Sequence, residues 1–307
     1  MKLTRVTITG ADDGVDPMHL ADFSRRFPFV EWGLLGSLKR EGESRYPSKD
    51  WVQRLKRVAP ASAQLSHHLC GELARRALSD QPSLVSGYTR ARRVQVNALP
   101  TMDLFKTGFL DVARRYPETE IILQAGAPQS IATVLLLADE APNVVCLFDP
   151  SRGTGKHGDW RIPTPGVGSP RDVDRLRLGW AGGINPSNVV HVIQTLLELP
   201  RAGEFWIDVE TGVRSAPDRF DLEKVLELLT KASSFIGVEG KPPRAPNEKP
   251  RGLVRSSSDE VLFVGLLEFV SKQPCTCLRL PEKEKPCIVC EASTRKAEIE
   301  HRPELPR

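Results

Sequence analysis

The sequence lacks the features that mark membrane-spanning, secreted or nucleic-acid-binding proteins. It has no run of about 18 apolar residues, the length a membrane-spanning helix needs, so we expect no such span. Residues 1–6 lack the apolar core and cleavage pattern of a secretory signal, so we expect a cytoplasmic location. The densest basic stretch, Arg75 to Arg93, has no regular interleaving of aromatic residues. Together with a net charge of only +4, this favours solvated helix and loop faces over a nucleic-acid footprint.

Cysteine is scarce over most of the chain. Only Cys70 and Cys146 precede the last 35 or so residues, and both lie in apolar strand patterns, which predicts small core residues. The other four cysteines cluster near the C-terminus, where they need a separate explanation: Cys275, Cys277, Cys287 and Cys290.

Apolar runs rich in β-branched residues alternate with helical periodicity along the first 235 or so residues. The predicted strands are 3–9, 29–35, 62–67, 93–98, 120–124, 144–149, 178–181 and 205–209. The predicted helices are 17–27, 48–58, 71–78, 103–116, 130–139, one starting near residue 186, and 221–232.

Strict alternation of apolar strands and helices predicts a parallel sheet covered by helices. Eight strands within about 235 residues favour an α/β fold of the (βα)8 TIM-barrel type over a doubly wound open sheet. The open sheet would usually hold phosphate after its first strand. Here that strand ends in Gly10-Ala-Asp-Asp-Gly14, which is acidic and poorly suited to an anion.

The composition changes after the predicted barrel, which we assign to residues 1–236. Residues 237–257 are rich in Pro, Lys and Gly and are predicted to be a linker. Residues 258–307 are predicted to form a short amphipathic helix, 259–272, followed by the cysteine-containing tail.

Two glycine-containing turns are the most informative feature of the barrel region. Strand 178–181 runs into Gly182-Gly183-Ile-Asn-Pro, and strand 205–209 runs into Glu-Thr211-Gly212. Glycine lets the backbone approach a ligand closely, and the N–H groups of a helix N-terminus attract anions. The loops after the last two barrel strands are a common place for phosphate, so these turns predict a phosphate cradle.

Polar residues also occur at or inside several apolar strands, where an unpaired polar group costs about 1–3 kcal/mol. Active sites of such barrels are built at the strand C-termini, so these residues are site candidates. Each one is about equally well explained as an internal hydrogen-bond or ion-pair partner. The candidates are Thr9, Asp12, Asp13, Glu31, His67, His68, Asn97, Gln124, Asp149, Asn185 and Asp208.

Three segments, 148–155, 180–189 and 207–213, occur in the order and spacing of the last three strand ends of phosphoribosylanthranilate isomerase. They read FDPSRGTG, WAGGINPSNV and IDVETGV, and the chain resembles that family of ribulose-phosphate-binding barrels, which serves tryptophan synthesis. Residues 64–67 and 7–10 resemble the family's third and first strands more weakly. The resemblance extends in layout over about residues 1–232 and is specific only in the final third.

The resemblance implies an Amadori rearrangement of an aminoaldose phosphate to an aminoketose phosphate. An acid protonates the ring oxygen and a base removes the C2 proton. Carried over by position, Asp149 is the general acid, whereas Gly182, Gly183, Thr211 and Gly212 bind phosphate. No cofactor is implied for the barrel.

The chain departs from the family at the base. The family uses a cysteine at the end of the first strand, and Thr9 stands there in this sequence. A threonine hydroxyl has no accessible thiolate-like form near neutral pH. The base is therefore expected to be Asp12, Glu31 or His67. The family's arginine-containing stretch after strand two is also missing, although Arg45 lies in the corresponding loop.

Two functional hypotheses follow. In the first, the barrel is an isomerase acting on a small phosphorylated metabolite with a changed base. In the second, it is a non-catalytic or regulatory barrel that binds a sugar phosphate. The polar ring of Glu31, Asn97, Gln124 and Asp208 weighs toward the enzyme, since a phosphate binder needs no such ring.

The C-terminal cysteines follow the pattern Cys-x-Cys, nine residues, Cys-x-x-Cys. Four thiols at such spacings are able to surround zinc tetrahedrally. The Cys-x-Cys spacing and the neighbouring prolines are equally consistent with an extended, partly disordered tail. A redox role is the third interpretation. The substrate's identity and the oligomeric state are not determined by the sequence.

Overall fold

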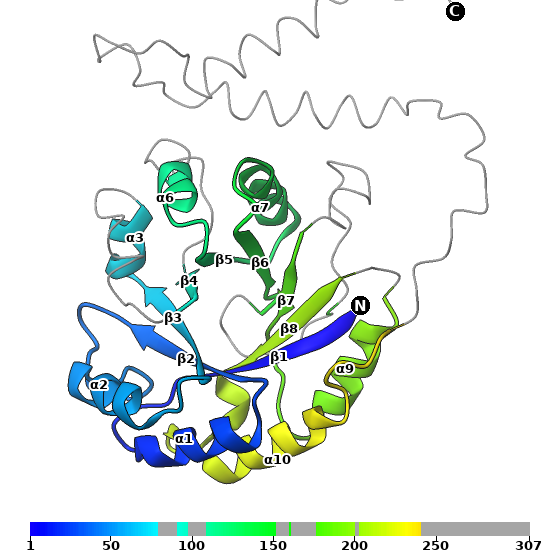
Figure 1. The fold of residues 1–307 in the computed structure, drawn as a ribbon. Coiled ribbons are helices and arrows are strands. Elements are labelled where there is room, and N and C mark those ends of the chain that lie inside the picture. Colours follow the sequence, from blue (N-terminus) through cyan, green and yellow to red (C-terminus); the bar gives the residue numbers. More distant parts are fainter. Residues whose placement is uncertain (79–90, 98–108, 152–159, 161–175, 200–202, 241–307) are drawn as a thin grey trace, which may run out of the picture.

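A computed structural model describes residues 1–78, 91–97, 109–151, 160, 176–199 and 203–240. Eight parallel strands close into a barrel in sequence order, with β1 paired to both β2 and β8. Figure 1 shows the helices as a ring outside these strands. The predicted (βα)8 TIM barrel is confirmed.

The strands are β1 (Lys2–Thr9), β2 (Val30–Gly36), β3 (Gln64–Cys70), β4 (Arg93–Asn97), β5 (Glu120–Ala125), β6 (Val144–Phe148), β7 (Leu178–Trp180) and β8 (Glu204–Val209). The described helices are α1 (Pro17–Arg26), α2 (Lys49–Val58), α3 (Glu72–Leu78), α6 (Phe109–Arg115), α7 (Pro128–Glu140), α9 (Val189–Leu197) and α10 (Leu222–Ser233).

Side-chain caps fix the starts of three of these helices. Asp16 accepts the amide of Met18 before α1, and Ser48 accepts the amide of Trp51 before α2. Asp221 accepts two amides of the first turn of α10. Such caps satisfy N–H groups that have no partner within the helix.

The observed strands match the predicted ones closely, with one difference that affects the site. β3 extends to Cys70, three residues beyond the predicted end at His67. Pairing with β4 continues through His68–Gln95 and Cys70–Asn97, so the side chains of these residues lie on the same face of the sheet.

Short elements between β8 and α10 were not predicted. A 3-10 turn, η1 (Thr211–Val213), is followed by the two-residue strands β9 (Arg214–Ser215) and β10 (Arg219–Phe220). They form a small antiparallel hairpin beside the barrel mouth. Elements of two residues leave too little periodicity for a sequence pattern to indicate them.

Most of the apolar core lies between the barrel and its helices. Alternate strand residues, such as Ile121 and Leu123, face that shell, whereas Ile122 belongs to a second, small cluster with Leu147 and Trp206. Because successive strand side chains point to opposite faces, the second cluster lies inside the barrel. It fills the interior on the side of β5, β6 and β8.

The described chain ends beside its beginning. Ile236 bridges to Leu3, and the amide of Gly240 donates to the carbonyl of Met1 over 2.7 Å. The predicted helix 259–272, the cysteines 275–290 and all of the predicted linker except 237–240 lie outside the described residues. Among the described helices, none is both long and apolar enough to cross a membrane.

Candidate functional site

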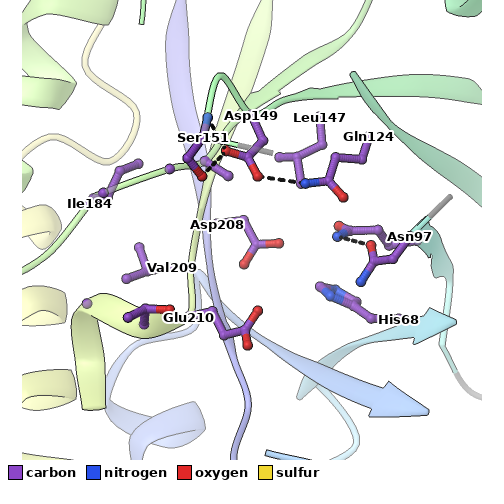
Figure 2. A pocket seen from close by; sticks show the side chains of 16 residues that line it. His68, Asn97, Gln124, Leu147, Asp149, Ser151, Ile184, Asp208, Val209 and Glu210 are labelled. Atoms are coloured by element: carbon purple, nitrogen blue, oxygen red, sulfur yellow. Dashed lines mark hydrogen bonds between the residues drawn. The ribbon is translucent and has the colours of Figure 1, made fainter. Parts of the chain in front are cut away.

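A pocket opens at the carboxyl ends of the barrel strands, which is where barrel enzymes carry their sites. Figure 2 shows its polar side chains converging from several strands. One wall comes from β3, β4 and β5, and the opposite wall from the ends of β6, β7 and β8. The lining residues are His68, Gln95, Asn97, Gln124, Leu147, Asp149, Ser151, Ala181, Gly182, Gly183, Ile184, Asp208, Val209, Glu210, Thr211 and Gly212.

The two glycine turns touch each other along one edge of this pocket. A Cβ atom on Gly212 would lie 1.9 Å from the carbonyl oxygen of Ile184, so only glycine allows this backbone contact. Gly182 and Gly183 have φ angles of 93° and 70°, the left-handed region that side chains disfavour. The adjacency on which the phosphate prediction depends is therefore present.

Some amides near the start of α9 are already occupied. The amide of Asn185 donates to Asn188 Oδ1 over 2.8 Å, and the amide of Ser187 donates to Asn185 Oδ1 over 2.8 Å. These side chains shape the turn and use the N–H groups that the sequence suggested for an anion. The glycine turns themselves, which line the pocket, are thus the better place for a phosphate.

Asp149 lies directly after β6 and is 3% exposed. Its Oδ2 accepts from Gln124 Nε2 over 2.6 Å, and its Oδ1 accepts from the amide and hydroxyl of Ser151 over 2.9 and 2.6 Å. A hydroxyl is able to donate to a carboxylate or accept from a carboxylic acid. This partner therefore suits a group that alternates between the two forms.

Asp149 is also in contact with the glycine turn. A Cβ atom on Gly182 would lie 2.7 Å from Asp149 Oδ1. The carboxyl of Asp149 and the turns that we predict to hold phosphate therefore belong to one continuous surface.

Asp208, the fifth residue of β8, has a carboxyl group directed into the barrel interior. Its Oδ1 accepts a hydrogen bond from the hydroxyl of Thr9, the last residue of β1, over 2.8 Å. Burial raises the pKa of Asp208 to about 8, and the nearby charges of Glu210 and Glu31 act in the same direction. The Thr9 hydrogen bond opposes this rise of the pKa.

The wall opposite Asp208 carries His68, Gln95 and Asn97. The ring of His68 lies 2.6 Å from Ser66 Oγ, and burial lowers the pKa of His68 to about 3, which keeps the imidazole neutral. Gln95 donates to Asn97 Oδ1, and Asn97 donates to the sulfur of Cys70 over 3.2 Å. Burial raises the pKa of the Cys70 thiol, so it remains protonated near neutral pH.

The structure brings most of the predicted site residues to this one pocket. All of the predicted binding residues line it, together with the predicted acid: Asp149, Gly182, Gly183, Asp208, Thr211, Gly212, Asn97 and Gln124. Their roles remain predictions, because lining a pocket does not assign a function.

The three candidate bases lie elsewhere, which corrects the expectation that one of them faces the substrate. His67 points out of the barrel toward Lys56 and α2, because it alternates with the inward-facing Ser66 and His68. Its pKa is lowered to about 3 by burial.

Glu31 is near the start of β2, at the opposite end of the barrel from the mouth. It accepts from Arg93 Nη1 over 2.7 Å and from Thr7 Oγ1 over 2.9 Å, and both carboxylate and guanidinium are almost fully buried. It is the ion-pair partner that the alternative reading of this residue anticipated.

Asp12 belongs to an ion network beside the mouth. It accepts from Arg214 Nη2 over 3.1 Å and from the amide of Arg45 over 2.8 Å. Arg45 in turn binds Asp218 with two nitrogens and Glu210 with a third, over 2.7 Å. These contacts join the loop after β2 to the hairpin after β8.

Sequence reasoning missed Gln95, Ser151 and Glu210, whereas His68 was among its strand-end candidates and lines the pocket. A signal existed for Gln95, because the inward positions of β4 alternate, and a correct end for β3 would have ranked His68 above His67. No sequence signal indicated that Glu210 meets Arg45 across 165 positions. Within the described part of the chain, no cluster of three or more His, Cys, Asp or Glu is arranged to hold a metal ion.

The sequence model of one protein family matches residues 109–231, and the family is described as N-(5'-phosphoribosyl)anthranilate (PRA) isomerase. The matched range contains Gln124, Asp149 and both glycine turns. It leaves out β1 to β4, which carry Thr9, His68 and Asn97.

Curated relatives point to the same family. The chain is 30% identical to the N-(5'-phosphoribosyl)anthranilate isomerase of Syntrophus aciditrophicus (strain SB) over 133 residues, 42% of this chain and 52% of that protein. It is 31% identical to that of Acaryochloris marina (strain MBIC 11017) over 148 residues, 46% of this chain and 55% of that protein. The chain spans about half the length of the curated relatives it matches.

Solved structures share the fold. The phosphoribosyl anthranilate isomerase of Thermotoga maritima matches with a TM-score of 0.53 and 22% identity, over 76% of this chain and 100% of that one. A structure of this isomerase in complex with reduced 1-(o-carboxyphenylamino)-1-deoxyribulose 5-phosphate matches with a TM-score of 0.51 and 20% identity, over the same shares of each chain. The chain therefore resembles phosphoribosylanthranilate isomerases, in sequence over the second half of the barrel and in fold over all of it.

Proposed function

We propose that this barrel binds a small phosphorylated sugar-type compound and isomerises it by an Amadori-type rearrangement. The observation that carries the proposal is the continuity of one surface: two touching glycine turns, with the carboxyl of Asp149 against Gly182. A phosphate held by the turns would place the sugar carbons of the same molecule over the carboxyl-lined interior. The family's structure with a bound 5-phosphate compound supports this class of substrate.

In the proposed reaction, Asp149 is the general acid. It gives its proton to the ring oxygen of the aminoaldose phosphate, the bond from C1 to that oxygen breaks, and the nitrogen lone pair forms a C1=N bond. Gln124 and Ser151 orient the carboxyl, and the Ser151 hydroxyl reverses its hydrogen bond as the proton leaves. Removal of the C2 proton then completes the path toward the aminoketose.

Phosphate binding at the turns would rest on backbone groups of Gly182, Gly183 and Gly212 and on the hydroxyl of Thr211. Arg45 Nη1 lies 3.3 Å from that hydroxyl oxygen, at the pocket edge. Because the Thr211 oxygen accepts from Arg45, the hydroxyl's own proton is available to donate to a phosphate. The partner is thus a phosphorylated metabolite, with no cofactor in the barrel.

The alternative is a barrel that binds a sugar phosphate without converting it. The replacement of the family's cysteine by Thr9 favours this reading, and the carboxyls of Asp149 and Asp208 favour catalysis. The two functions are distinguished by measuring thermal stabilisation and product formation with ribose 5-phosphate, ribose and a panel of N-substituted ribosylamine 5-phosphates. Thermal stabilisation by the phosphates without product from any of the panel would support the binder and contradict the enzyme.

Asp149→Asn tests the acid directly. We expect turnover to fall at least about a thousandfold, which corresponds to roughly 4 kcal/mol of lost transition-state stabilisation. Binding of ribose 5-phosphate, measured by thermal shift, is expected to change less than about threefold, because the turns are unaltered. Asp139→Asn, on the exposed face of α7, is the matched control. Turnover by the Asp149 variant at the normal rate would reject the assignment.

A further inference from the structure

The proposed reaction needs a group to accept the C2 proton, and the pocket offers two carboxyls besides Asp149. Figure 2 shows both: Asp208 lies between Asp149 and Glu210 and faces His68 and Asn97 across the pocket. Glu210 is engaged by Arg45 in an ion pair of 2.7 Å and is 36% exposed at its side chain. Asp208 is 6% exposed.

Asp208 has one oxygen held and one available. Oδ1 accepts the Thr9 hydroxyl, and no other hydrogen bond reaches this carboxyl from the described residues. The barrel interior around Thr9 and His68 has no room for a side chain at position 33. A Cβ atom on Gly33 would lie 2.2 Å from Thr9 Oγ1 and 2.9 Å from the ring of His68. Glycine at this position leaves room for the Thr9–Asp208 pair.

The charged and titratable groups around Asp208 come from five directions. The charges of Glu31 on β2, Arg93 on β4 and Glu210 after β8 act on its pKa. His68 on β3 and Asp149 after β6 line the same pocket. His68 is neutral at working pH, Arg93 is paired with Glu31 and Glu120, and Glu210 with Arg45. Asp208 is therefore a pocket carboxyl with no ion pair among the described residues.

We propose that Asp208, held in position by Thr9, is the general base of the reaction; this proposal rests on the proposed function. After the ring opens, an Asp208 oxygen takes the C2 proton. The C–H electron pair forms a C1=C2 bond, and the C1=N π electrons return to nitrogen. Loss of the proton from the C2 hydroxyl and gain of one at C1 then give the aminoketose. Transfer of the proton on Asp208 to Asp149 through solvent restores the starting enzyme.

Thr9 is a positioning residue in this scheme. Its hydroxyl donates to Asp208 and so stabilises the ionised form that accepts a proton. Burial acts on the pKa of Asp208 in the opposite direction and favours the protonated form. The pair thus explains how a threonine is used at the end of β1 although it cannot itself act as a base.

The pH dependence of kcat/KM tests the assignment. A base with a pKa of about 8 gives activity that rises with pH and levels off above about 8. Thr9→Val removes the hydrogen bond that lowers this pKa, so the midpoint should move about one pH unit higher. Activity at pH 7 should then fall about tenfold while the plateau remains. Thr9→Ser keeps a hydroxyl and should keep the wild-type midpoint.

Asp208→Asn completes the test. We expect at least a hundredfold loss of turnover and loss of C2 hydrogen exchange with solvent deuterium, followed by NMR on the same ribosylamine 5-phosphate. Thermal stabilisation by ribose 5-phosphate should persist and shows that the variant is folded. Turnover retained by this variant, or a pH midpoint unmoved by Thr9→Val, would overturn the role of Asp208 alone. Absence of turnover in the wild-type protein would overturn the proposed function, and this assignment with it.

Discussion

At the scale of single residues, the pocket combines groups whose protonation states differ because their surroundings differ. Asp208 and His68 are both buried, and burial disfavours the charged form of each. The result is an acid that keeps its proton to about pH 8 and a base that stays neutral down to about pH 3. Such opposed shifts at one pocket are typical of functional sites, where stability is given up for reactivity.

The Asp208 carboxyl should therefore cost stability at neutral pH. In the unfolded chain this carboxyl ionises near its ordinary pKa of 3.8, whereas in the folded chain it stays protonated to about 8. The folded state is thus progressively penalised as the pH rises from 4 to 8. Asparagine cannot ionise in either state, so Asp208→Asn should be more stable than the wild type at pH 8 and not at pH 4.

Thermal unfolding at pH 4, 6 and 8 measures this difference. A gain of even 2 kcal/mol corresponds to an increase in Tm of roughly 4–8 °C for a domain of this size. Asp139→Asn should show no gain that depends on pH. An Asp208 variant with the same Tm difference at pH 4 and pH 8 would contradict the raised pKa.

At the scale of elements, the site depends on contacts between loops that follow different strands. The turn after β7 touches the turn after β8 through Ile184 and Gly212. The loop after β2 is tied to the hairpin after β8 by Arg45 and Asp218, and this ion pair, with Arg214, holds the pKa of Asp218 well below its usual range. The mouth is therefore built from neighbouring loops at the point where β8 meets β1.

Gly212→Ala should separate the two turns. Its Cβ atom would be 1.9 Å from a backbone oxygen, which no side-chain rotation relieves. We expect binding of ribose 5-phosphate to weaken at least tenfold, with a loss of about 1–3 kcal/mol in stability. Isothermal titration and thermal unfolding measure these two effects. Gly14→Ala is the control, because its nearest neighbour is the side chain of Asp12 at 3.1 Å. Unchanged binding would show that phosphate is held elsewhere.

At the scale of the whole molecule, the barrel is closed before the C-terminal segment begins. Gly237 donates to Leu3, and Gly240 donates to Met1, so the described chain ends against the start of β1. The predicted division into a barrel of residues 1–236, a linker and a cysteine-containing tail remains a prediction. The zinc, tail and redox readings of the four cysteines remain open with it.

A chain ending at residue 240 tests this division. We expect it to keep the Tm of the full chain within about 3 °C and to bind ribose 5-phosphate equally, because the β1 contacts of Gly237 and Gly240 are retained. A chain ending at residue 235 loses those contacts and should melt lower. Metal analysis of both the full and the shortened chain reports on zinc. Aggregation or unfolding of the 240-residue chain would show that the barrel needs the segment beyond.

The sequence alone determined the barrel, the order of its strands and most of the pocket. Apolar strands that alternate with amphipathic helices allow few ways to bury their surfaces, and Asp149 and the glycine turns follow strands directly, so their place at the mouth follows from the fold.

Only the tertiary structure decided which polar strand residues face the pocket. In the sequence, Glu31, His67 and Asp208 are all polar residues within apolar strands. In the structure, Glu31 is paired with Arg93 at the far end of the barrel, His67 points outward and Asp208 faces the pocket. A shift of one residue reverses the side of a strand, and a buried charge finds its partner across the barrel. Both are properties of closed geometry, which local pattern does not contain.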